Sequence, residues 1–246
     1  MSMPINTAMI LAAGLGTRMR PLTDNLPKPM VKVGGKALID WVLDDLTKAG
    51  VANAVVNVHY KADLLRSHVQ QRTRPTISIS DETQVLLETG GGVAAALPLI
   101  NDDVFLVTNS DALWGKGLAP ALETLRTAWS QMTEAAEIDA LLLLAQMNRA
   151  FGFDGAGDFF VDTDNTPSRR GDNASAPMVY AGTQLVHRRI FERCPEGAFS
   201  FNALWNKAFE QNRLRAIVHE DNWYHVGTPE AVAPTAQALA KEGATS

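Results

Sequence analysis

The sequence is nearly free of cysteine. Its 246 residues contain one, Cys194, which excludes a disulfide bond within the chain. A protein without disulfides is compatible with a reducing compartment such as the cytoplasm. Because Cys194 precedes Pro195 in a stretch typical of a loop, we interpret it as a structural residue and not as a nucleophile.

Long apolar runs and an excess of basic residues are also missing. No run approaches the ~18 apolar residues that a membrane span requires. The first residues lack the basic and apolar segments of a secretion signal. A general nucleic-acid binder is usually basic, whereas this chain carries a net charge of -5. We therefore expect a cytoplasmic monomer or small homo-oligomer, with no nucleic acid and no membrane as a partner.

The first half of the chain contains a regular alternation of strand and helix signals. Short apolar runs predict buried strands, and apolar residues three or four positions apart predict the helices between them. The predicted strands are 8–12, 54–58, 76–80 and 104–108, and the predicted helices are 38–46, 61–71 and 93–97. This order predicts an α/β fold with a Rossmann-like, mostly parallel mixed sheet flanked by helices. Ligands of such sheets bind beyond the carboxyl ends of the strands.

The second half is less regular. The segment 152–176 is rich in Gly, Asp, Asn, Ser and Arg, a composition typical of turns and short strands. Around it, the predicted helices are 118–132, 202–211 and 229–241, and the predicted strands are 138–145, 179–186 and 214–218. Neither a repeat nor a low-complexity linker divides the chain, so we expect residues 1–246 to form a single domain.

The stretch 11–29 follows the first predicted strand and has the composition of a phosphate-binding loop. Gly14 and Gly16 let backbone N–H groups approach a ligand with no side chain in the way, and such a turn forms a nest for anions. Arg18 can hold a phosphate through two parallel hydrogen bonds, and Lys28 can add a point charge. The loop therefore predicts a polyphosphate ligand.

Two common phosphate motifs do not fit this loop. A Walker motif is absent, and the dinucleotide fingerprint is incomplete because Met19 stands where a third glycine is required. A dinucleotide-dependent oxidoreductase remains an alternative, although Asn57 and His59 end the second strand where an acidic residue is expected. The loop instead resembles the signature of the sugar-1-phosphate nucleotidyltransferases. The residues that carry this resemblance are Gly14, Gly16-Thr17-Arg18, Pro21-Leu22-Thr23 and Lys28-Pro29.

The resemblance implies a fold, an activity and a set of residues. The family transfers a nucleotidyl group from a nucleoside triphosphate to a sugar 1-phosphate and releases pyrophosphate. Residues 1 to about 135 would form the nucleotide-binding half, and residues from about 136 to 246 the sugar-phosphate-binding half with the C-terminal helix. The implied nucleotide-binding residues are Leu11, Ala12, Ala13, Gly14, Gly16, Thr17, Arg18, Lys28, Glu88, Thr89, Gly91 and Asn109.

A second glycine cluster lies in the stretch Leu87-Glu-Thr-Gly-Gly-Gly-Val93. It is either a turn that caps the following helix or a surface on which a base or ribose lies directly on the backbone. In the family, the loop at this place covers the nucleobase. Its form here looks most like the branch that makes UDP-N-acetylmuramic acid or GDP-mannose, and less like the thymidylyltransferases.

Two residues are candidate metal ligands. Asp111 follows a predicted strand; a lone aspartate there is often a turn residue, but in the family this motif ends in the aspartate that binds Mg²⁺, which prefers oxygen ligands. His225 stands where the family usually has a second metal-binding aspartate. Imidazole suits Mn²⁺ or Zn²⁺ better than Mg²⁺, so His225 binds a metal, hydrogen-bonds a phosphate or water, or fills space.

The signals for the sugar are weaker. Gly157, Asp158 and Tyr180 fall where the family contacts the hexose. The family's Glu-Lys-Pro element is missing, and Arg169 and Arg170 occupy that region. A charged pair in a polar loop is usually solvated; alternatively, one of the two binds the phosphate of the sugar phosphate.

Together these expectations describe a cytoplasmic nucleotidyltransferase with Arg18, Lys28 and Asp111 as catalytic residues. The sugar-phosphate oxygen is already ionised near neutral pH, so no general base is required. The resemblance implies UTP and N-acetylmuramic acid 1-phosphate as preferred substrates, and GTP with mannose 1-phosphate as the next pair. A non-catalytic sugar-nucleotide-binding regulatory protein remains an alternative because His225 replaces a carboxylate.

Overall fold

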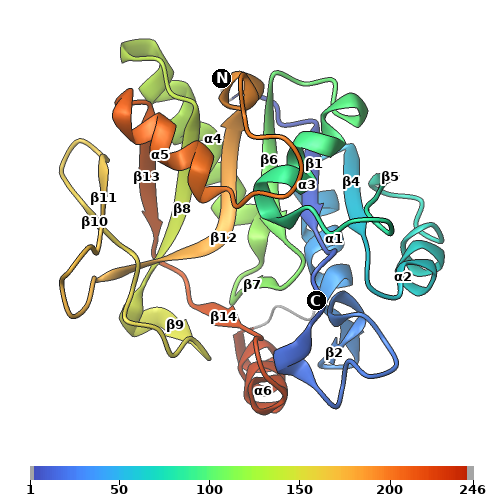
Figure 1. Cartoon of the computed structure of the whole chain (residues 1–246). Helices are drawn as coiled ribbons and strands as arrows, with labels where there is room; N and C mark the ends of the chain where they lie inside the picture. The colour runs from blue at the N-terminus through green and yellow to red at the C-terminus, as the bar shows by residue number, and fades with distance from the viewer. Residues whose placement is uncertain (1–2, 243–246) are drawn as a thin grey trace.

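The computed structural model describes residues 3–242. At its centre, β1 (Thr7–Leu11) pairs in parallel with β4 (Asn53–Val58) on one side and β6 (Val104–Asn109) on the other. Next to β4, β5 (Thr76–Asp81) continues the parallel sheet (Figure 1). The four strands predicted in the first half are therefore confirmed.

The second half extends the same sheet. Strand β12 (Met178–His187) runs antiparallel to β6 and to β8 (Ala140–Gln146), and β13 (Leu214–His219) is parallel to β8. The order across the sheet is thus β13-β8-β12-β6-β1-β4-β5, with β12 opposed to its neighbours. This arrangement confirms the predicted mostly parallel mixed sheet.

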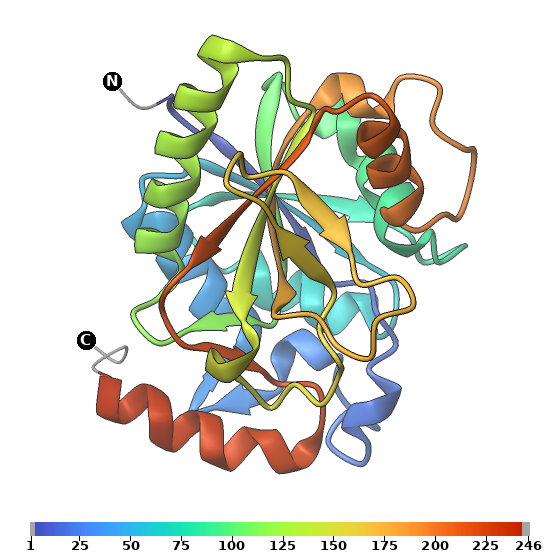
Figure 2. The same ribbon diagram turned by 90° about the vertical axis from the view of Figure 1, so that its left-hand side faces the viewer.

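Helices cover both faces of the sheet (Figure 2). One face packs against α1 (Leu38–Lys48), α2 (Ala62–Val69) and α4 (Leu118–Ala135), and the other against α3 (Glu88–Ala96) and α5 (Asn202–Glu210). Alternate residues of β1 point to opposite faces, so Ile10 joins the first apolar cluster and Met9 the second.

Smaller elements frame the site. The hairpin β10 (Phe159–Val161) and β11 (Pro167–Arg169) projects beside the start of β12 (Figure 1). A separate sheet has the order β7-β14-β9, and β2 pairs with β3. The bounds are β2 Lys32–Val33, β3 Lys36–Ala37, β7 Ala112–Trp114, β9 Ala150–Phe151 and β14 Trp223–His225. Single 3-10 turns occupy Thr17–Met19, Lys28–Met30, Leu97–Leu99, Met147–Arg149, Arg188–Phe191 and Pro229–Ala231.

Two predicted helices differ from the structure at their starts. The closing helix begins as the 3-10 turn at Pro229 and becomes α6 (Val232–Glu242). Helix α3 begins at Glu88 and therefore contains the second glycine cluster, which was expected to precede the helix as a turn or an open surface. Close packing explains the glycines. A Cβ on Gly90 would lie 2.4 Å from the Phe199 ring, and a Cβ on Gly91 would lie 2.3 Å from the Gly197 carbonyl oxygen.

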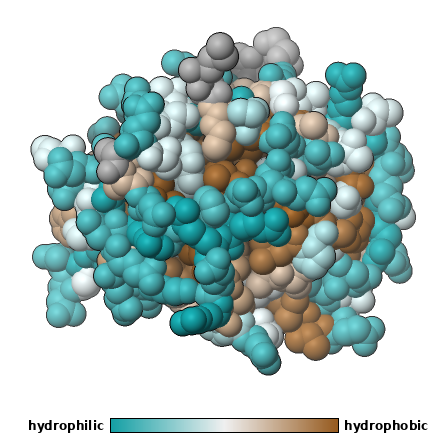
Figure 3. All heavy atoms as spheres, turned by 90° about the horizontal axis from the view of Figure 1, so that it is seen from above, coloured by the Kyte–Doolittle hydropathy of each residue, from teal (hydrophilic) through white to brown (hydrophobic). Residues whose placement is uncertain are grey.

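The face of the molecule seen from above is largely polar (Figure 3). Seen from above, hydrophilic side chains surround separate apolar patches (Figure 3). Within residues 3–242, no helix has both the length and the apolar character that crossing a membrane demands.

Candidate active site

Two adjoining cavities lie beyond the carboxyl ends of β1 and β6, where the topology predicts a ligand. We name the two cavities after the ligands that the sequence resemblance implies for their lining residues. The first, the nucleotide cavity, has a volume of about 520 Å³. It is lined by Leu11, Ala12, Ala13, Gly14, Arg18, Lys28, Pro29, Asn57, Leu86, Glu88, Thr89, Asn109, Ser110, Asp111, Ser200 and His225. The second, the sugar cavity, has a volume of about 530 Å³. Leu11, Thr89, Asn109 and Ser200 line both cavities and form the junction between them.

The loop after β1 folds back on itself. Gly16 adopts a left-handed conformation with φ of 63°, and its carbonyl oxygen accepts a hydrogen bond of 2.8 Å from the Thr23 hydroxyl. A Cβ on Gly16 would lie 3.0 Å from the Cβ of Lys28, so glycine at this position allows the two parts of the loop to approach each other closely. Gly16 and Thr17 thus shape the loop but do not line either cavity, whereas Gly14, Arg18 and Lys28 do line the nucleotide cavity.

Lys28 and Asp111 form an ion pair in the nucleotide cavity. The Lys28 ammonium donates a hydrogen bond to Oδ2 of Asp111, and both side chains are more than four-fifths buried. Lys28 begins a 3-10 turn after Pro27, and Asp111 follows β6, so two distant segments of the chain meet here. All three predicted catalytic residues, Arg18, Lys28 and Asp111, therefore lie in one cavity.

The small sheet brings His225 to the same place. In the β7–β14 pair, His225 lies opposite Ala112, the residue after Asp111. The imidazole packs against Gly227, where a Cβ would lie 2.5 Å from Nε2. Burial lowers the pKa of His225, Lys28 and Arg18 lower it further, and Asp111 opposes them. His225 is therefore neutral near pH 7 and has a lone pair to offer to a metal ion or a proton donor.

Sequence reasoning missed a buried polar network under the nucleotide cavity. The backbone N–H of Ala12 donates to Oδ1 of Asn57 at 2.6 Å, and Nδ2 of Asn57 donates to Oε1 of Glu82 at 2.7 Å. Oε2 of Glu82 accepts a hydrogen bond of 3.0 Å from the backbone N–H of Leu87. The network ties the phosphate loop to the start of α3. An amide inside the apolar run 54–58 was the available signal.

The start of α3 forms another wall of the nucleotide cavity. Glu88 and Thr89 line it, as expected, and the Thr89 hydroxyl accepts a 2.9 Å hydrogen bond from the backbone N–H of Phe201. Gly91 differs from the expectation. It is buried, its N–H donates to the carbonyl oxygen of Phe199, and it lines neither cavity. In the structure, Gly91 allows the backbone of residues 197–199 to pack closely against α3.

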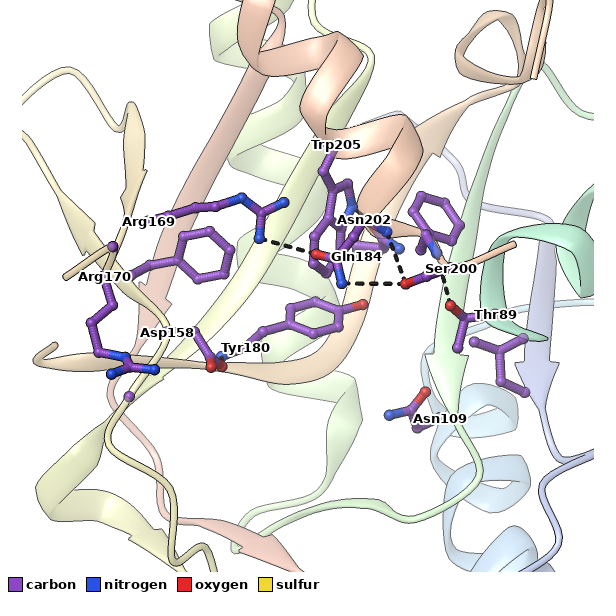
Figure 4. A pocket seen from close by; sticks show the side chains of 15 residues that line it. Thr89, Asn109, Asp158, Arg169, Arg170, Tyr180, Gln184, Ser200, Asn202 and Trp205 are labelled. Carbon is purple, nitrogen blue, oxygen red and sulfur yellow. Dashed lines mark hydrogen bonds between the residues drawn. The ribbon is translucent and has the colours of Figure 1, made fainter. Parts of the chain in front are cut away.

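The sugar cavity contains all five residues expected to bind the sugar phosphate: Gly157, Asp158, Arg169, Arg170 and Tyr180 (Figure 4). Phe159, Phe201 and Trp205 supply apolar rings to its wall. Oδ2 of Asp158 accepts a hydrogen bond of 2.9 Å from the backbone N–H of Tyr180. Burial raises the pKa of the Tyr180 phenol, which is therefore protonated at neutral pH. The cavity combines aromatic surface with polar groups, a combination suited to a sugar.

Known proteins resemble this chain over most of its length. Residues 7–150 match the Nucleotidyl transferase family. N-acetylmuramate alpha-1-phosphate uridylyltransferase of Caulobacter vibrioides is 41% identical over 235 residues, which cover 94% of this chain and 96% of the relative. The protein of the same name from Neisseria meningitidis is 34% identical and covers 90% of this chain and 93% of its own length.

A solved structure supports the fold independently. The inositol-1-phosphate CTP transferase from T. maritima superposes with a TM-score of 0.82 over 98% of both chains, at 16% identity. Identity this low indicates a shared fold only. The family expected from the glycine loop is confirmed by the extent of the sequence match. The chain belongs to the nucleotidyl transferase family.

Proposed function

We propose that this protein transfers the uridylyl group of UTP to N-acetylmuramic acid 1-phosphate and releases pyrophosphate. The observation that carries the proposal is the junction of two cavities at Leu11, Thr89, Asn109 and Ser200. A triphosphate in one cavity and a sugar phosphate in the other would bring their reacting groups together there. The names of the two uridylyltransferases described above, which match 94% and 90% of this chain, support this choice of substrates.

The chain's own residues act by positioning and by neutralising charge. A phosphate oxygen of the sugar 1-phosphate forms a bond to the α-phosphorus, and the bond from that phosphorus to the departing pyrophosphate oxygen breaks. The nucleophile is already ionised, so no proton has to be removed. Arg18 and Lys28 stabilise the charge that grows on the α-phosphoryl group and the pyrophosphate.

The residues present fit a divalent cation. Asp111 supplies a carboxylate and His225 a neutral nitrogen, and both line the nucleotide cavity. Among residues 3–242 no cluster of three or more His, Cys, Asp or Glu side chains forms a metal site. Two protein ligands are enough for Mg²⁺, which keeps several waters and binds substrate phosphates. When bound, the ion would neutralise triphosphate charge; we propose Mg²⁺, with Mn²⁺ as a substitute that suits the nitrogen better.

The proposed roles divide the domain by function. All residues that line the nucleotide cavity precede residue 136, except Ser200 and His225. The sugar cavity is formed mainly by later residues. We therefore propose a nucleotide-binding half and a sugar-binding half of one domain, in a cytoplasmic enzyme that reuses a cell-wall sugar.

A screen of pyrophosphate release tests the proposal. Four nucleoside triphosphates are combined with the 1-phosphates of N-acetylmuramic acid, N-acetylglucosamine and mannose, and Lys28→Ala serves as the background control. We expect the highest kcat/KM for UTP with N-acetylmuramic acid 1-phosphate. A faster reaction of GTP with mannose 1-phosphate would identify a guanylyltransferase. Binding without turnover of any pair would indicate the regulatory alternative.

A further inference from the structure

The two arginines of the sugar cavity are held in different ways. Arg169 donates from Nη1 to Oδ1 of Asn202 at 3.0 Å and from Nη2 to Oδ1 of Asn206 at 2.8 Å. Its guanidinium also lies over the rings of Phe159 and Phe209, at 5.8 and 5.3 Å. Both ends of the Arg169 fork are thus used to hold the hairpin β10–β11 against α5.

Arg170 keeps donors available. Its Nη1 makes one long hydrogen bond of 3.3 Å to the carbonyl oxygen of Asn173. Its Nε is buried and has no hydrogen-bond partner among residues 3–242. The only side-chain hydrogen bond of Arg170 within residues 3–242 comes from Nη1, so Nη2 is available to a ligand that accepts hydrogen bonds.

The charge of the cavity favours an anion. Its charged lining residues are Asp158, Arg169 and Arg170, which leave one net positive charge. One oxygen of the Asp158 carboxylate is already bound to the backbone N–H of Tyr180. A second anion besides the reacting phosphate would therefore be accommodated in this cavity, and Arg170 has the free donors for it.

The position of Arg170 separates it from the reacting phosphate. Arg170 and Asp158 lie at one end of the cavity, Thr89 and Asn109 lie at the other, and Tyr180 lies between them (Figure 4). Thr89 and Asn109 belong to the junction with the nucleotide cavity. A sugar whose anomeric phosphate is at the junction would direct the far side of its ring toward Arg170. Neither arginine is then placed to hold that phosphate.

We propose that Arg170 binds a carboxylate carried on the far side of the sugar ring and so determines which sugar 1-phosphate is used. The inference rests on the proposed function, because N-acetylmuramic acid has such a group. Its lactyl ether is attached at C3 and extends outward from the ring, away from the anomeric phosphate, and N-acetylglucosamine lacks it. A guanidinium matches a carboxylate through two parallel hydrogen bonds, which Arg170 would donate from its two terminal nitrogens, because its Nε is buried.

The test compares three sugar 1-phosphates in the uridylyl transfer assay. They are those of N-acetylmuramic acid, of its lactyl amide and of N-acetylglucosamine; the amide keeps the size of the carboxylate but not its charge. The variants are Arg170→Gln, Arg170→Lys and, as a matched control, Arg169→Gln. Thermal unfolding of each variant reports whether the hairpin still folds.

We expect Arg170→Gln to lower kcat/KM for N-acetylmuramic acid 1-phosphate roughly ten- to hundred-fold, mainly through KM, because a charge-assisted hydrogen-bond pair is lost. The values for the amide and for N-acetylglucosamine 1-phosphate should stay unchanged, so the preference collapses. Arg170→Lys should keep part of it, since charge remains without the fork. Arg169→Gln should affect all three sugars equally.

Two other results would overturn the assignment. An equal loss for all three sugars in Arg170→Gln would show that Arg170 serves a group they share, such as the phosphate, or only the fold. An unchanged preference would place carboxylate recognition elsewhere. If the unmodified protein does not use N-acetylmuramic acid 1-phosphate at all, the proposed function fails first, and this inference falls with it.

Discussion

The ammonium of Lys28 and the carboxylate of Asp111 are paired in the nucleotide cavity, although 83 positions separate them in the chain. Each neutralises the charge of the other, which allows both groups to be largely buried. Asp111 would supply a carboxylate oxygen to a divalent cation, and Lys28 would supply a positive charge to the phosphates.

Replacing Asp111 by asparagine should remove activation by a divalent cation while nucleotide still binds. Asparagine keeps the shape of the side chain but not the charge that attracts the ion. Turnover measured over a titration of Mg²⁺ should stay at least about a hundred-fold below that of the unmodified protein, in the range seen when one electrostatic group of a site is removed. Asp24→Asn is the control, because Asp24 is exposed and pairs with Arg20. A normal activation curve for Asp111→Asn would move the metal elsewhere.

Arg18→Ala and Lys28→Ala should each lower kcat by ~10²–10³-fold, the usual loss when a preorganised charge at a developing anion is removed. Arg18 is exposed on a polar loop, so Arg18→Ala should change the unfolding temperature little. Lys28→Ala leaves the buried Asp111 carboxylate without its partner and should lower the unfolding temperature. Arg20→Ala is the matched control, because Arg20 lies on the same loop, does not line the cavity and is 63% exposed. Near-normal turnover in either cavity variant would contradict the role of phosphate clamp.

His225→Asp should shift the metal preference toward Mg²⁺. The unmodified protein, with a nitrogen beside Asp111, should turn over faster with Mn²⁺ than with Mg²⁺ at equal concentration. An added carboxylate provides the oxygen ligand that Mg²⁺ prefers. His225→Asn separates ligation from filling of space, since it retains polarity with a weaker donor atom. If that variant keeps both the rate and the metal preference, His225 is not a ligand.

Gly91→Ala tests whether the glycines of α3 serve packing. Alanine favours an isolated helix by about 1 kcal/mol, but its Cβ would lie 2.3 Å from the carbonyl oxygen of Gly197, an atom of the backbone. The clash should outweigh the gain in helix propensity and lower the unfolding temperature. It should also displace the segment that contains Ser200, a residue that lines both cavities. Urea denaturation should likewise show a lower free energy of unfolding. A higher value would show that the segment near Gly197 can move away from the added Cβ at little cost.

Stability should fall as the pH drops below about 6.5, the pKa of histidine in an unfolded chain. Burial lowers the pKa values of His187 and His219 in the folded protein. Over that range the unfolded chain therefore binds more protons, and acid favours unfolding. Urea denaturation at pH 7.5 and pH 5.5 measures the loss. The double variant His187→Gln, His219→Gln should lose less between these two pH values; an equal loss would assign the effect to other groups.

The longer strands and helices, and their order along the chain, were predictable from the amino-acid sequence. Buried strands such as 54–58 and helices such as 38–46 are encoded by the spacing of apolar residues. This spacing is a local property, so it can be recognised without knowing which elements pack against the segment. The phosphate loop was also predictable, because Gly14, Arg18 and Lys28 lie close together in the chain. The absence of a side chain at Gly14 and the positive charges of Arg18 and Lys28 indicate phosphate binding directly. The family followed from the same stretch.

Several contacts in the site depend on the tertiary fold, because the local sequence pattern does not encode them. The register of β7 and β14 places His225 opposite Ala112, the residue after Asp111, and both His225 and Asp111 line the nucleotide cavity. No spacing in the sequence specifies that register. The helical state of Gly91 contradicts its low helix propensity, because the segment around Gly197 must approach the helix backbone. Arg169 and Arg170 are equivalent as letters. Their roles differ only in the folded protein. The terminal nitrogens of Arg169 are hydrogen-bonded to α5, whereas, among residues 3–242, Arg170 makes no hydrogen bond to that helix.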